Sequence, residues 1–231
     1  MYRDLVVIIP IFNESPNIVL NLVNSITDHG LQVILVNDGS NDFYNYDVIN
    51  GAQQIKHSRN LGQGAALVTG MKKALDDGFR FCVHFDSDGQ HDPQDIIRLY
   101  NIIKTENLDI ILGSRFLPDC EKSSMSFLRK IILKIGAIIN YLICGLLLSD
   151  SNNGFRMMNR KTMEVLILKS SRMAHASEII WLIKWNNLKY KEVGIKVNYT
   201  QYSLSKGQPL YKSISVFIEI CQTLKLYKIG K

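Results

Sequence analysis

The sequence predicts an α/β protein built on an open, doubly wound and mostly parallel β-sheet. Short uninterrupted runs of Val, Ile and Leu are bounded by turn-forming residues, which is typical of strands buried on both faces. These runs alternate with helical patterns of about a dozen residues, which predict helices on the two faces of the sheet. The 231 residues, 46% of them hydrophobic and 21% charged, suffice for one sizeable core.

Strands and helices alternate along the first half of the chain. Strands are predicted at "LVVIIPI", "QVILVN", "QQIKHS", "FRFCVHF" and "LDIILGS". Helices are predicted from about Glu14 to His29, Gly64 to Asp77 and Pro93 to Thr105. Asp92 is expected to cap the third helix, since aspartate is a favoured N-cap residue and proline suits the first helical position.

The second half of the chain contains two amphipathic segments. The run "FLRKIILKIGAIINYLICGLLL", residues 127–148, is interrupted by Lys134 and Asn140, and its longest uncharged stretch is shorter than the roughly 20 residues that a membrane span needs. We expect it to form a helix lying in a membrane interface; the alternative is a buried core helix. Residues Ile214 to Leu226 predict a second amphipathic helix, with Ile218, Cys221 and Leu224 on its apolar face.

The charge of the chain indicates what kind of surface it binds, and its cysteines indicate the compartment in which it works. The net charge is +6, and the basic residues concentrate in the second half, which favours an anionic membrane surface. Nucleic acid is not expected, because no helix-turn-helix, zinc-finger or aromatic RNA-binding pattern accompanies this charge. The four cysteines are scattered without metal-ligand spacing, which together with the lack of a signal-peptide pattern indicates reduced thiols and a cytoplasmic protein.

Polar residues gather where three of the predicted strands end. Asn13 and Glu14 follow the first strand, residues 37–40 ("NDGS") follow the second, and residues 86–90 ("DSDGQ") follow the fourth. Each cluster alone is compatible with turn chemistry. Because ligands of such sheets bind outside the carboxyl ends of the strands, the three clusters together predict one binding crevice.

The spacing of Asp86 and Asp88 indicates a divalent cation site. Mg²⁺ binds through one or two carboxylates together with substrate phosphates, so this pair would hold a nucleotide diphosphate through a metal ion. The glycine-rich "RNLGQGAALVTG", with Gly62 and Gly64, precedes a predicted helix N-terminus that favours anions. It matches neither a Walker A loop nor a dinucleotide-binding fingerprint, so ATPase and dehydrogenase activities are not favoured.

Six ordered motifs resemble a known family. They are "VVIIPIFNESPNI", "VILVNDGSND", "RNLGQGAALVTGMKKAL", "FDSDGQHDPQDI", "ILGSRF" and "DSNNGFRMMNR", which span roughly Val6 to Arg160. They resemble family 2 glycosyltransferases of the GT-A fold, and within that family the branch of dolichyl-phosphate mannosyltransferase and bacterial polyprenyl-phosphate sugar transferases.

The resemblance implies roles for individual residues of the crevice. Residues expected to contact the nucleotide, the base or the cofactor are Pro10, Asn13, Glu14, Asp38, Gly64 and Asp86. Residues expected to hold Mg²⁺ or Mn²⁺ are Asp86, Asp88 and Gln90. Arg115 and Arg156 are expected to neutralise phosphates, since guanidinium groups bind them bidentately.

The acceptor determines whether a catalytic base is needed. A phosphate monoester is largely dianionic at pH 7 and needs none, whereas a hydroxyl acceptor needs one, for which Asp150 and Glu178 are the candidates. Arg129 suits a lipid phosphate, and Lys206 and Gln208 fall in a predicted mobile lid.

The expected enzyme is an inverting, metal-dependent hexosyltransferase that uses a UDP- or GDP-sugar and a polyprenyl phosphate at the cytoplasmic membrane face. The expected division is a catalytic domain over residues 1–200, with a nucleotide-binding half 1–115 and an acceptor half 116–200, followed by a lid and helix over 201–231. Attachment is expected to be peripheral, helped by a small membrane protein or by homo-oligomerisation. The alternatives are transfer to a hydroxyl of a lipid-linked or cell-surface glycan, and a non-catalytic nucleotide-sugar-binding subunit.

Overall fold

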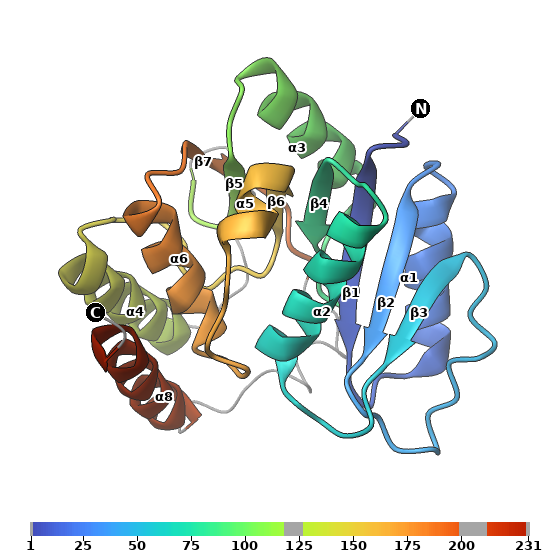
Figure 1. Ribbon diagram of the computed structural model, residues 1–231, viewed down its shortest axis with the longest axis horizontal. Helices are drawn as coiled ribbons and strands as arrows, with labels where there is room; N and C mark the ends of the chain where they lie inside the picture. Colours follow the sequence, from blue (N-terminus) through green and yellow to red (C-terminus); the bar gives the residue numbers. More distant parts are fainter. Residues whose placement is uncertain (1, 118–126, 199–211, 230–231) are drawn as a thin grey trace.

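The computed structural model describes residues 2–117, 127–198 and 212–229. A seven-stranded sheet in the order β3-β2-β1-β4-β6-β5-β7 forms its centre (Figure 1). The strands are β1 Leu5–Ile11, β2 Gln32–Asn37, β3 Ala52–Lys56, β4 Phe81–His84, β5 Ile110–Ser114, β6 Arg156–Asn159 and β7 Tyr190–Gly194. The prediction of a mostly parallel α/β sheet is confirmed.

One strand of the sheet runs against the others. β6 pairs antiparallel with β4 on one side and with β5 on the other, while the remaining pairs of strands are parallel. The sequence of β6, "RMMN", lacks the Val/Ile run by which the other central strands were predicted. Its position places Arg156 opposite His84 of β4, in the middle of the sheet.

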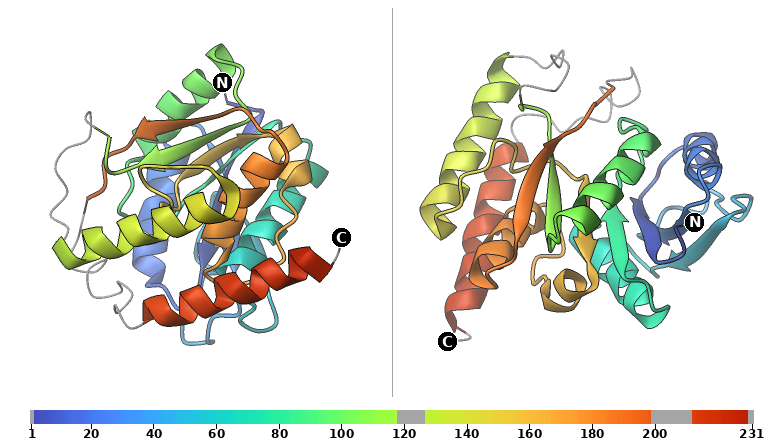
Figure 2. Two further views of the ribbon diagram at one scale, coloured as in Figure 1. Left: turned by 90° about the vertical axis from the view of Figure 1, so that its left-hand side faces the viewer. Right: turned by 90° about the horizontal axis from the view of Figure 1, so that it is seen from above.

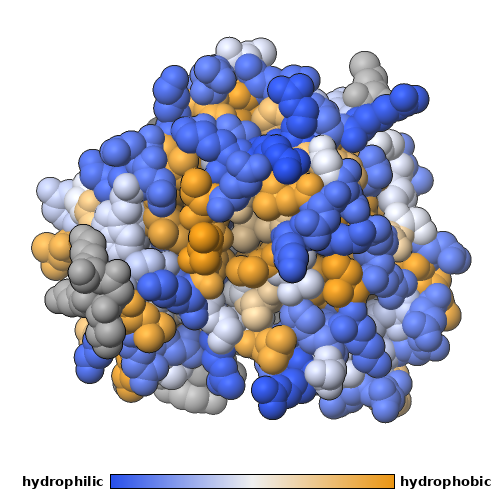
Figure 3. All heavy atoms as spheres, viewed as in Figure 1, coloured by the Kyte–Doolittle hydropathy of each residue, from blue (hydrophilic) through white to orange (hydrophobic). Residues whose placement is uncertain are grey.

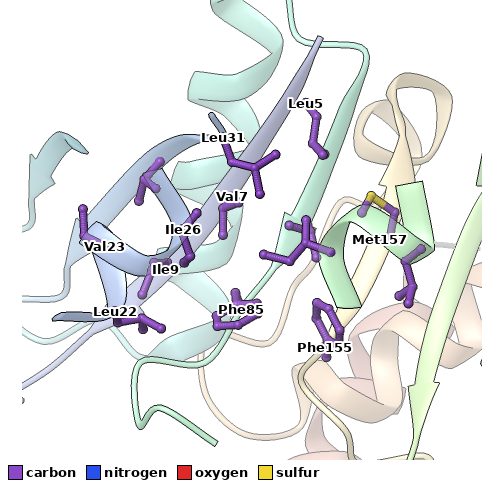
Figure 4. Close-up of a cluster of buried hydrophobic side chains, with 14 of the residues drawn as sticks. Leu5, Val7, Ile9, Leu22, Val23, Ile26, Leu31, Phe85, Phe155 and Met157 are labelled. Atoms are coloured by element: carbon purple, nitrogen blue, oxygen red, sulfur yellow. The ribbon is translucent and has the colours of Figure 1, made fainter. Parts of the chain in front are cut away.

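The helices form layers on the two faces of the sheet. They are α1 Pro16–Thr27, α2 Gln63–Asp76, α3 Pro93–Thr105, α4 Phe127–Cys144, α5 Arg160–Val165, α6 His175–Trp185 and α8 Lys212–Ile229. Leu5, Val7 and Ile9 of β1 pack with α1 and α3 in one core (Figure 4), whereas Val6 and Ile8 pack with α2, α5 and α6 in the other. This alternation follows from the two-residue period of a strand, which sends successive side chains to opposite faces.

The predicted bounds of the first helices hold to within two residues or so at each end. α1 starts at Pro16 rather than near Glu14, and α2 starts one residue before Gly64. The predicted start of α3 is confirmed, because the Asp92 side chain accepts a 2.9 Å hydrogen bond from the Gln94 backbone N–H.

α4 and α8 lie outside α6, on the same side of the molecule (Figure 2). The inward face of α4 carries Asn140, which is buried and accepts a 3.0 Å hydrogen bond from the Trp181 indole. The outward face carries exposed apolar side chains at Ile131, Ile135, Ile138, Tyr141 and Leu142, together with the exposed Lys134. Apolar side chains accordingly reach the surface at the α4 edge of the molecule (Figure 3). α4 is therefore not a fully buried core helix, because its apolar side chains face outward.

The predicted apolar face of the C-terminal helix is largely not the face that packs on the rest of the protein. Ile218 and Cys221 are exposed, and Leu224 is only partly buried. The buried face of α8 is instead centred on Ile220 and Thr223, which pack toward α6. Within the described ranges, no helix is long and apolar enough to cross a bilayer.

Candidate active site

A cleft of about 880 Å³ opens at the carboxyl ends of β1, β2 and β4. The three predicted polar clusters line it together: residues 10–14 after β1, Asp38 after β2, and Asp86, Asp88 and Gln90 after β4. They meet because β1, the strand between β2 and β4, is parallel to both, so the three strands end on the same edge of the sheet.

Asp38 is buried at the base of the cleft and holds the glycine-rich segment. Its Oδ1 accepts hydrogen bonds from Leu61 N at 2.9 Å and from His57 Nδ1 at 2.7 Å, and its Oδ2 accepts one from Gly62 N at 2.8 Å. His57 Nε2 lies 2.9 Å from the hydroxyl of Thr69. The imidazole donates from Nδ1 to Asp38 and contacts the Thr69 hydroxyl through Nε2, which fixes the orientation of the Asp38 carboxylate.

The end of β1 is shaped by an unusual backbone conformation. Asn13 has a φ of 52°, in the left-handed region that asparagine tolerates better than most residues. Its backbone N–H donates to Ser40 Oγ at 2.9 Å, and its side-chain oxygen accepts from Asn41 N at 3.0 Å. These bonds join the ends of β1 and β2, so Asn13 and Glu14 project at the rim of the cleft beside Asp38.

Asp86 and Asp88 lie in the cleft with different local partners. Asp88 accepts hydrogen bonds from Gln90, 3.1 Å from its backbone N and 2.8 Å from its side-chain amide. Burial and the neighbouring charge of Asp86 raise the pKa of Asp88 to about 6. Burial would also raise the pKa of Asp86, but His91 and Arg156 outweigh it and hold that pKa below its usual value. The pair therefore concentrates negative charge in the cleft, which a cation would neutralise.

A close backbone approach sets the position of Asp86. A Cβ built on Gly154 would lie 2.3 Å from Asp86 Oδ2, so the carboxylate packs directly against this glycine. His91 is buried, stacks on Phe155 and places its Nε2 3.7 Å from the same oxygen, Asp86 Oδ2. Gly154, the glycine of "NNGFR", is therefore needed to leave room for the Asp86 carboxylate.

The donor set suits Mg²⁺ or Mn²⁺ rather than a metal that prefers nitrogen or sulfur ligands, such as Zn²⁺. Among the described residues, no three His, Cys, Asp or Glu side chains are grouped to hold a metal ion. Asp86, Asp88 and Gln90 offer two carboxylates and an amide oxygen at the rim of an open cleft. Hard oxygen ligands with room for water and phosphate are what Mg²⁺ and Mn²⁺ accept.

Arg115 lines the cleft with its guanidinium already paired. Its Nε and Nη2 lie 2.7 and 2.9 Å from the two carboxylate oxygens of Asp150, whose side chain is fully buried. Glu192 in turn accepts from Ser149 N at 2.9 Å and from Asp150 N at 3.2 Å. Asp150 does not line the cleft, so the structure places it as the support of Arg115.

Arg156 lies beneath the cleft rather than in it. It is buried in β6, and its Nη1 has no hydrogen-bond partner among the described residues. Burial lowers its pKa to about 10 despite the opposing charges of Asp86 and Asp150. The structure therefore places it as a buried positive charge behind Asp86.

Glu178 and Gly64 also lie outside the cleft lining. Glu178 is fully buried in α6, where its carboxylate accepts from Lys169 N at 2.6 Å, Ser170 N at 2.9 Å and the Tyr227 hydroxyl at 2.6 Å. Gly64 is buried against the carbonyl of Ser170. The side chain of Arg129, and the whole of Lys206 and Gln208, lie outside the described residues.

One part of the cleft is formed by residues that no sequence motif indicated. Arg172 and Met173, between α5 and α6, line it together with Ser215, Val216 and Glu219 of α8. None of these residues lies at a strand end or in a recognised motif, so no sequence pattern pointed to them.

Comparison with known proteins identifies the family. The family described as glycosyl transferase family 2 matches residues 6–167. The chain belongs to glycosyl transferase family 2. This glycosyltransferase is 31% identical to the UDP-N-acetylglucosamine–dolichyl-phosphate N-acetylglucosaminyltransferase of Methanococcus voltae, over 97% of this chain and 96% of that protein. It is also 26% identical to the polyprenol monophosphomannose synthase of Mycolicibacterium smegmatis, over 87% of this chain and 79% of that protein.

Solved structures show the same fold. Glucosyl-3-phosphoglycerate synthase from Mycobacterium tuberculosis, in a complex with Mn²⁺, UDP and glucosyl-3-phosphoglycerate, aligns with a TM-score of 0.69 at 16% identity, covering 96% of this chain and 78% of that one. The predicted GT-A-like fold and the resemblance to family 2 glycosyltransferases are both confirmed.

Proposed function

We propose that this glycosyltransferase moves a hexose from a nucleotide diphosphate sugar to the phosphate of a polyprenyl lipid, with inversion and with a divalent cation. The observation that carries the proposal is the Asp86 and Asp88 pair, which lies in one cleft with Asp38, Glu14 and Arg115. The near full-length match to a dolichyl-phosphate N-acetylglucosaminyltransferase supports the lipid phosphate as acceptor.

The nucleotide proposed is UDP. The Methanococcus voltae relative is named for a UDP-sugar. In the cleft, Asp38 Oδ1 already accepts two hydrogen bonds and Oδ2 accepts one. A carboxylate has about four acceptor sites, so one remains. Uracil presents a single ring N–H, which fits one acceptor site, whereas guanine presents two N–H groups on one edge.

The group transfer balances without a proton acceptor. An oxygen of the acceptor phosphate attacks the anomeric carbon as the bond from that carbon to the diphosphate oxygen breaks. The sugar configuration inverts, and the nucleoside diphosphate leaves. Because the attacking phosphate monoester has a second pKa near 6, it is already largely dianionic at pH 7.

The residues of the cleft supply charge compensation. Asp86, Asp88 and Gln90 would hold Mg²⁺ or Mn²⁺, which when bound stabilises the charge developing on the leaving diphosphate. Arg115 is oriented toward the cleft by Asp150 and contributes positive charge there. Arg156 is a buried cation behind Asp86, and its charge lowers the pKa of that carboxyl group. It thereby offsets part of the repulsion between the carboxylates of Asp86 and Asp88.

The contacts of Asp150 and Glu178 favour a phosphate acceptor over a hydroxyl. The Asp150 carboxylate is fully buried and bound by Arg115 through both oxygens. The Glu178 carboxylate is buried and accepts three hydrogen bonds. Neither group lines the cleft, so neither is placed to remove a proton from an acceptor hydroxyl.

The outward face of α4 is proposed to contact the membrane surface that carries the lipid. Ile131, Ile135, Ile138 and Leu142 recur at helical spacing and are all exposed. An amphipathic helix lying in the headgroup region buries such a face without crossing the bilayer. We accordingly propose that the protein is a peripheral enzyme at the cytoplasmic face of the membrane.

A lipid-transfer assay tests the proposal. Purified protein is incubated with radiolabelled UDP-glucose, UDP-N-acetylglucosamine or GDP-mannose and with vesicles containing undecaprenyl phosphate. We expect label from a UDP-sugar in an organic-extractable, mild-acid-labile lipid, abolished by EDTA and by Asp88→Asn. The matched control is Asp42→Asn, since the Asp42 side chain is fully exposed outside the cleft. Donor binding without lipid label would contradict the proposal, and label on a glycan hydroxyl would favour the alternative acceptor.

A further inference from the structure

The cleft has a second wall that the strand ends do not form. The segment between α5 and α6 contributes Arg172 and Met173, and the first turns of α8 contribute Ser215, Val216 and Glu219. The two parts are joined where the Glu219 carboxylate accepts from Ala174 N at 3.3 Å. We call these five lining residues the α8 wall.

The backbone that carries Arg172 is held by a buried carboxylate. Glu178 accepts the N–H groups of Lys169 and Ser170, and its third partner is the Tyr227 hydroxyl of α8. The Lys169 ammonium also lies 4.2 Å from the Tyr227 ring centroid. One carboxylate therefore fixes the segment before Arg172 and joins it to α8.

The glycine-rich segment seats the same backbone from the other side. A Cβ on Gly62 would lie 2.3 Å from the Ser171 carbonyl oxygen, and one on Gly64 would lie 2.4 Å from the Ser170 carbonyl oxygen. The Ser171 carbonyl accepts from Ala65 N at 3.1 Å. These two glycines are thus needed for the close approach of the Arg172 segment, in addition to any role toward an anion.

The side chain of Arg172 is exposed, although its backbone is held on both sides. Arg172 and Arg115 are the two cations among the lining residues, and the guanidinium of Arg115 is bound by Asp150. Within the described ranges no carboxylate lies within ion-pair distance of Arg172. A cation held at the wall of an acidic cleft, without a carboxylate of its own, is suited to an anionic ligand.

The residues around Arg172 suit a ligand in which a phosphate is attached to an apolar chain. Met173 and Val216 lie in the same wall and supply apolar contact surface. These two side chains lie beside Arg172 among the residues that line the cleft. A nucleoside diphosphate has no apolar chain to match this surface.

We propose that Arg172 binds a phosphate group at the α8 wall, and that this phosphate is the monoester of the lipid acceptor. The assignment rests on the proposed function for its acceptor class, and it adds a residue to which no role has been given above. Arg172 is then a binding residue, and Glu178 is a positioning residue that acts through the backbone of Lys169 and Ser170.

Calorimetric titration of the whole protein separates the two sources of phosphate. The probes are farnesyl phosphate, farnesol as its phosphate-free control, and UDP with MnCl₂. The variants are Arg172→Gln, Arg172→Lys and the control Arg80→Gln, because Arg80 is an exposed arginine at the opposite end of β4. None of these probes requires turnover.

We expect Arg172→Gln to raise the Kd of farnesyl phosphate about tenfold to a hundredfold, the effect of losing a charge-assisted contact. Arg172→Lys should recover part of this loss, since it keeps the charge but not the bidentate geometry. Arg80→Gln, and the Kd of UDP with Mn²⁺ in every variant, should change by less than about twofold.

Three results would overturn the assignment. A raised Kd for UDP with unchanged farnesyl phosphate binding would show that Arg172 holds the donor diphosphate. Unchanged Kd values for both probes in Arg172→Gln, or equal binding of farnesol and farnesyl phosphate by wild type, would show that Arg172 binds no phosphate of the acceptor. Arg172-dependent binding of farnesyl phosphate without any transfer to lipid would instead count against the proposed reaction and leave the binding site standing.

Discussion

The two walls of the cleft are built by different means. The strand-end wall consists of short turns directly after β1, β2 and β4, so its functional side chains lie one to six residues beyond a buried parallel strand. The α8 wall is assembled from a loop and a helix that are distant in sequence, joined by a buried carboxylate and seated on glycines. The first wall takes its rigidity from the sheet, whereas the second depends on tertiary contacts and is therefore the more sensitive to mutation.

The largest expected effect comes from removing the glycine that seats the α8 wall. Gly62→Ala places a Cβ 2.3 Å from a carbonyl oxygen and forces alanine to a φ of 106°. We expect the free energy of unfolding to fall by about 3 kcal/mol, combining strain and displacement of the loop. Urea denaturation followed by circular dichroism measures this change.

The matched control for this substitution is Gly78→Ala. Gly78 also has a positive φ, of 82°, but a Cβ there meets nothing within 4 Å. It should cost only the conformational strain, about 1 kcal/mol. Equal losses in the two variants would show that the α8 wall does not need the close approach at Gly62.

The next largest effect is the pH dependence of the free energy of unfolding, to which the buried residues His84 and His175 contribute. Burial, with a contribution from Arg156, lowers the pKa of His84 to about 3 and that of His175 to about 4. The unfolded chain therefore binds more protons than the folded one below about pH 6.5, so the free energy of unfolding must fall as the pH drops from 6.5 toward 4.

A variant assigns part of this pH dependence to the α8 wall. His175→Asn keeps a donor for the Arg172 carbonyl, which accepts from His175 Nδ1 at 2.6 Å. Between pH 7.5 and 5 we expect the variant to lose about 2 kcal/mol less than wild type, the equivalent of about one and a half pKa units. His29→Asn, at an exposed position, should follow the wild-type curve. Superimposed curves for wild type and His175→Asn would contradict the prediction.

The strand-end wall is tested by Gly154→Ala. The added methyl group would meet the Asp86 carboxylate at 2.3 Å, and this flexible side chain can turn away. We therefore expect a loss of Mn²⁺-dependent UDP binding of about tenfold or more, with the free energy of unfolding changed by less than about 1 kcal/mol. Calorimetry and urea denaturation of the same preparation measure both quantities. A large loss of stability with intact UDP binding would show that Gly154 serves packing instead of the acidic site.

The smallest effect is that of Tyr227→Phe, which removes one hydrogen bond to Glu178. The phenol donates at 2.6 Å to a carboxylate that keeps its two backbone donors. We expect a loss of about 1 kcal/mol in the free energy of unfolding. Farnesyl phosphate binding should weaken while UDP binding is unchanged, since the contact belongs to the α8 wall. An effect on UDP binding instead would show that the two walls are not separate.

The difference between the walls also explains what the sequence could predict. Asn13, Asp38, Asp86 and Asp88 were found because each follows an apolar run, and the direction of a parallel strand fixes where its end lies. Arg172 has no such signal, because its place in the cleft depends on how the segment between α5 and α6 packs on Gly62. The antiparallel β6 was not foreseen for a similar reason, since "RMMN" becomes a central strand only through its neighbours.

The buried face of a helix could be predicted where the helix has one apolar stripe. It could not be predicted where two sides of the helix are apolar and either could pack on the protein. α3 has a single buried stripe along Ile96, Leu99 and Ile103, and its bounds and cap agree with the sequence. α8 packs largely through a face other than the predicted apolar one, because its helical pattern offers two apolar sides. Only contact with α6 selects Ile220 and leaves Ile218 exposed.

The most direct test of the account is Mn²⁺ binding in the presence of UDP, measured by electron paramagnetic resonance on wild type, Asp88→Asn and Arg172→Gln. We expect wild type and Arg172→Gln to bind Mn²⁺ with similar Kd values and Asp88→Asn to bind at least about tenfold more weakly, because the strand-end wall alone holds the cation. Equal Kd values for Asp88→Asn and wild type would contradict the assignment of the acidic pair and, with it, the division of the cleft into a donor wall and an acceptor wall.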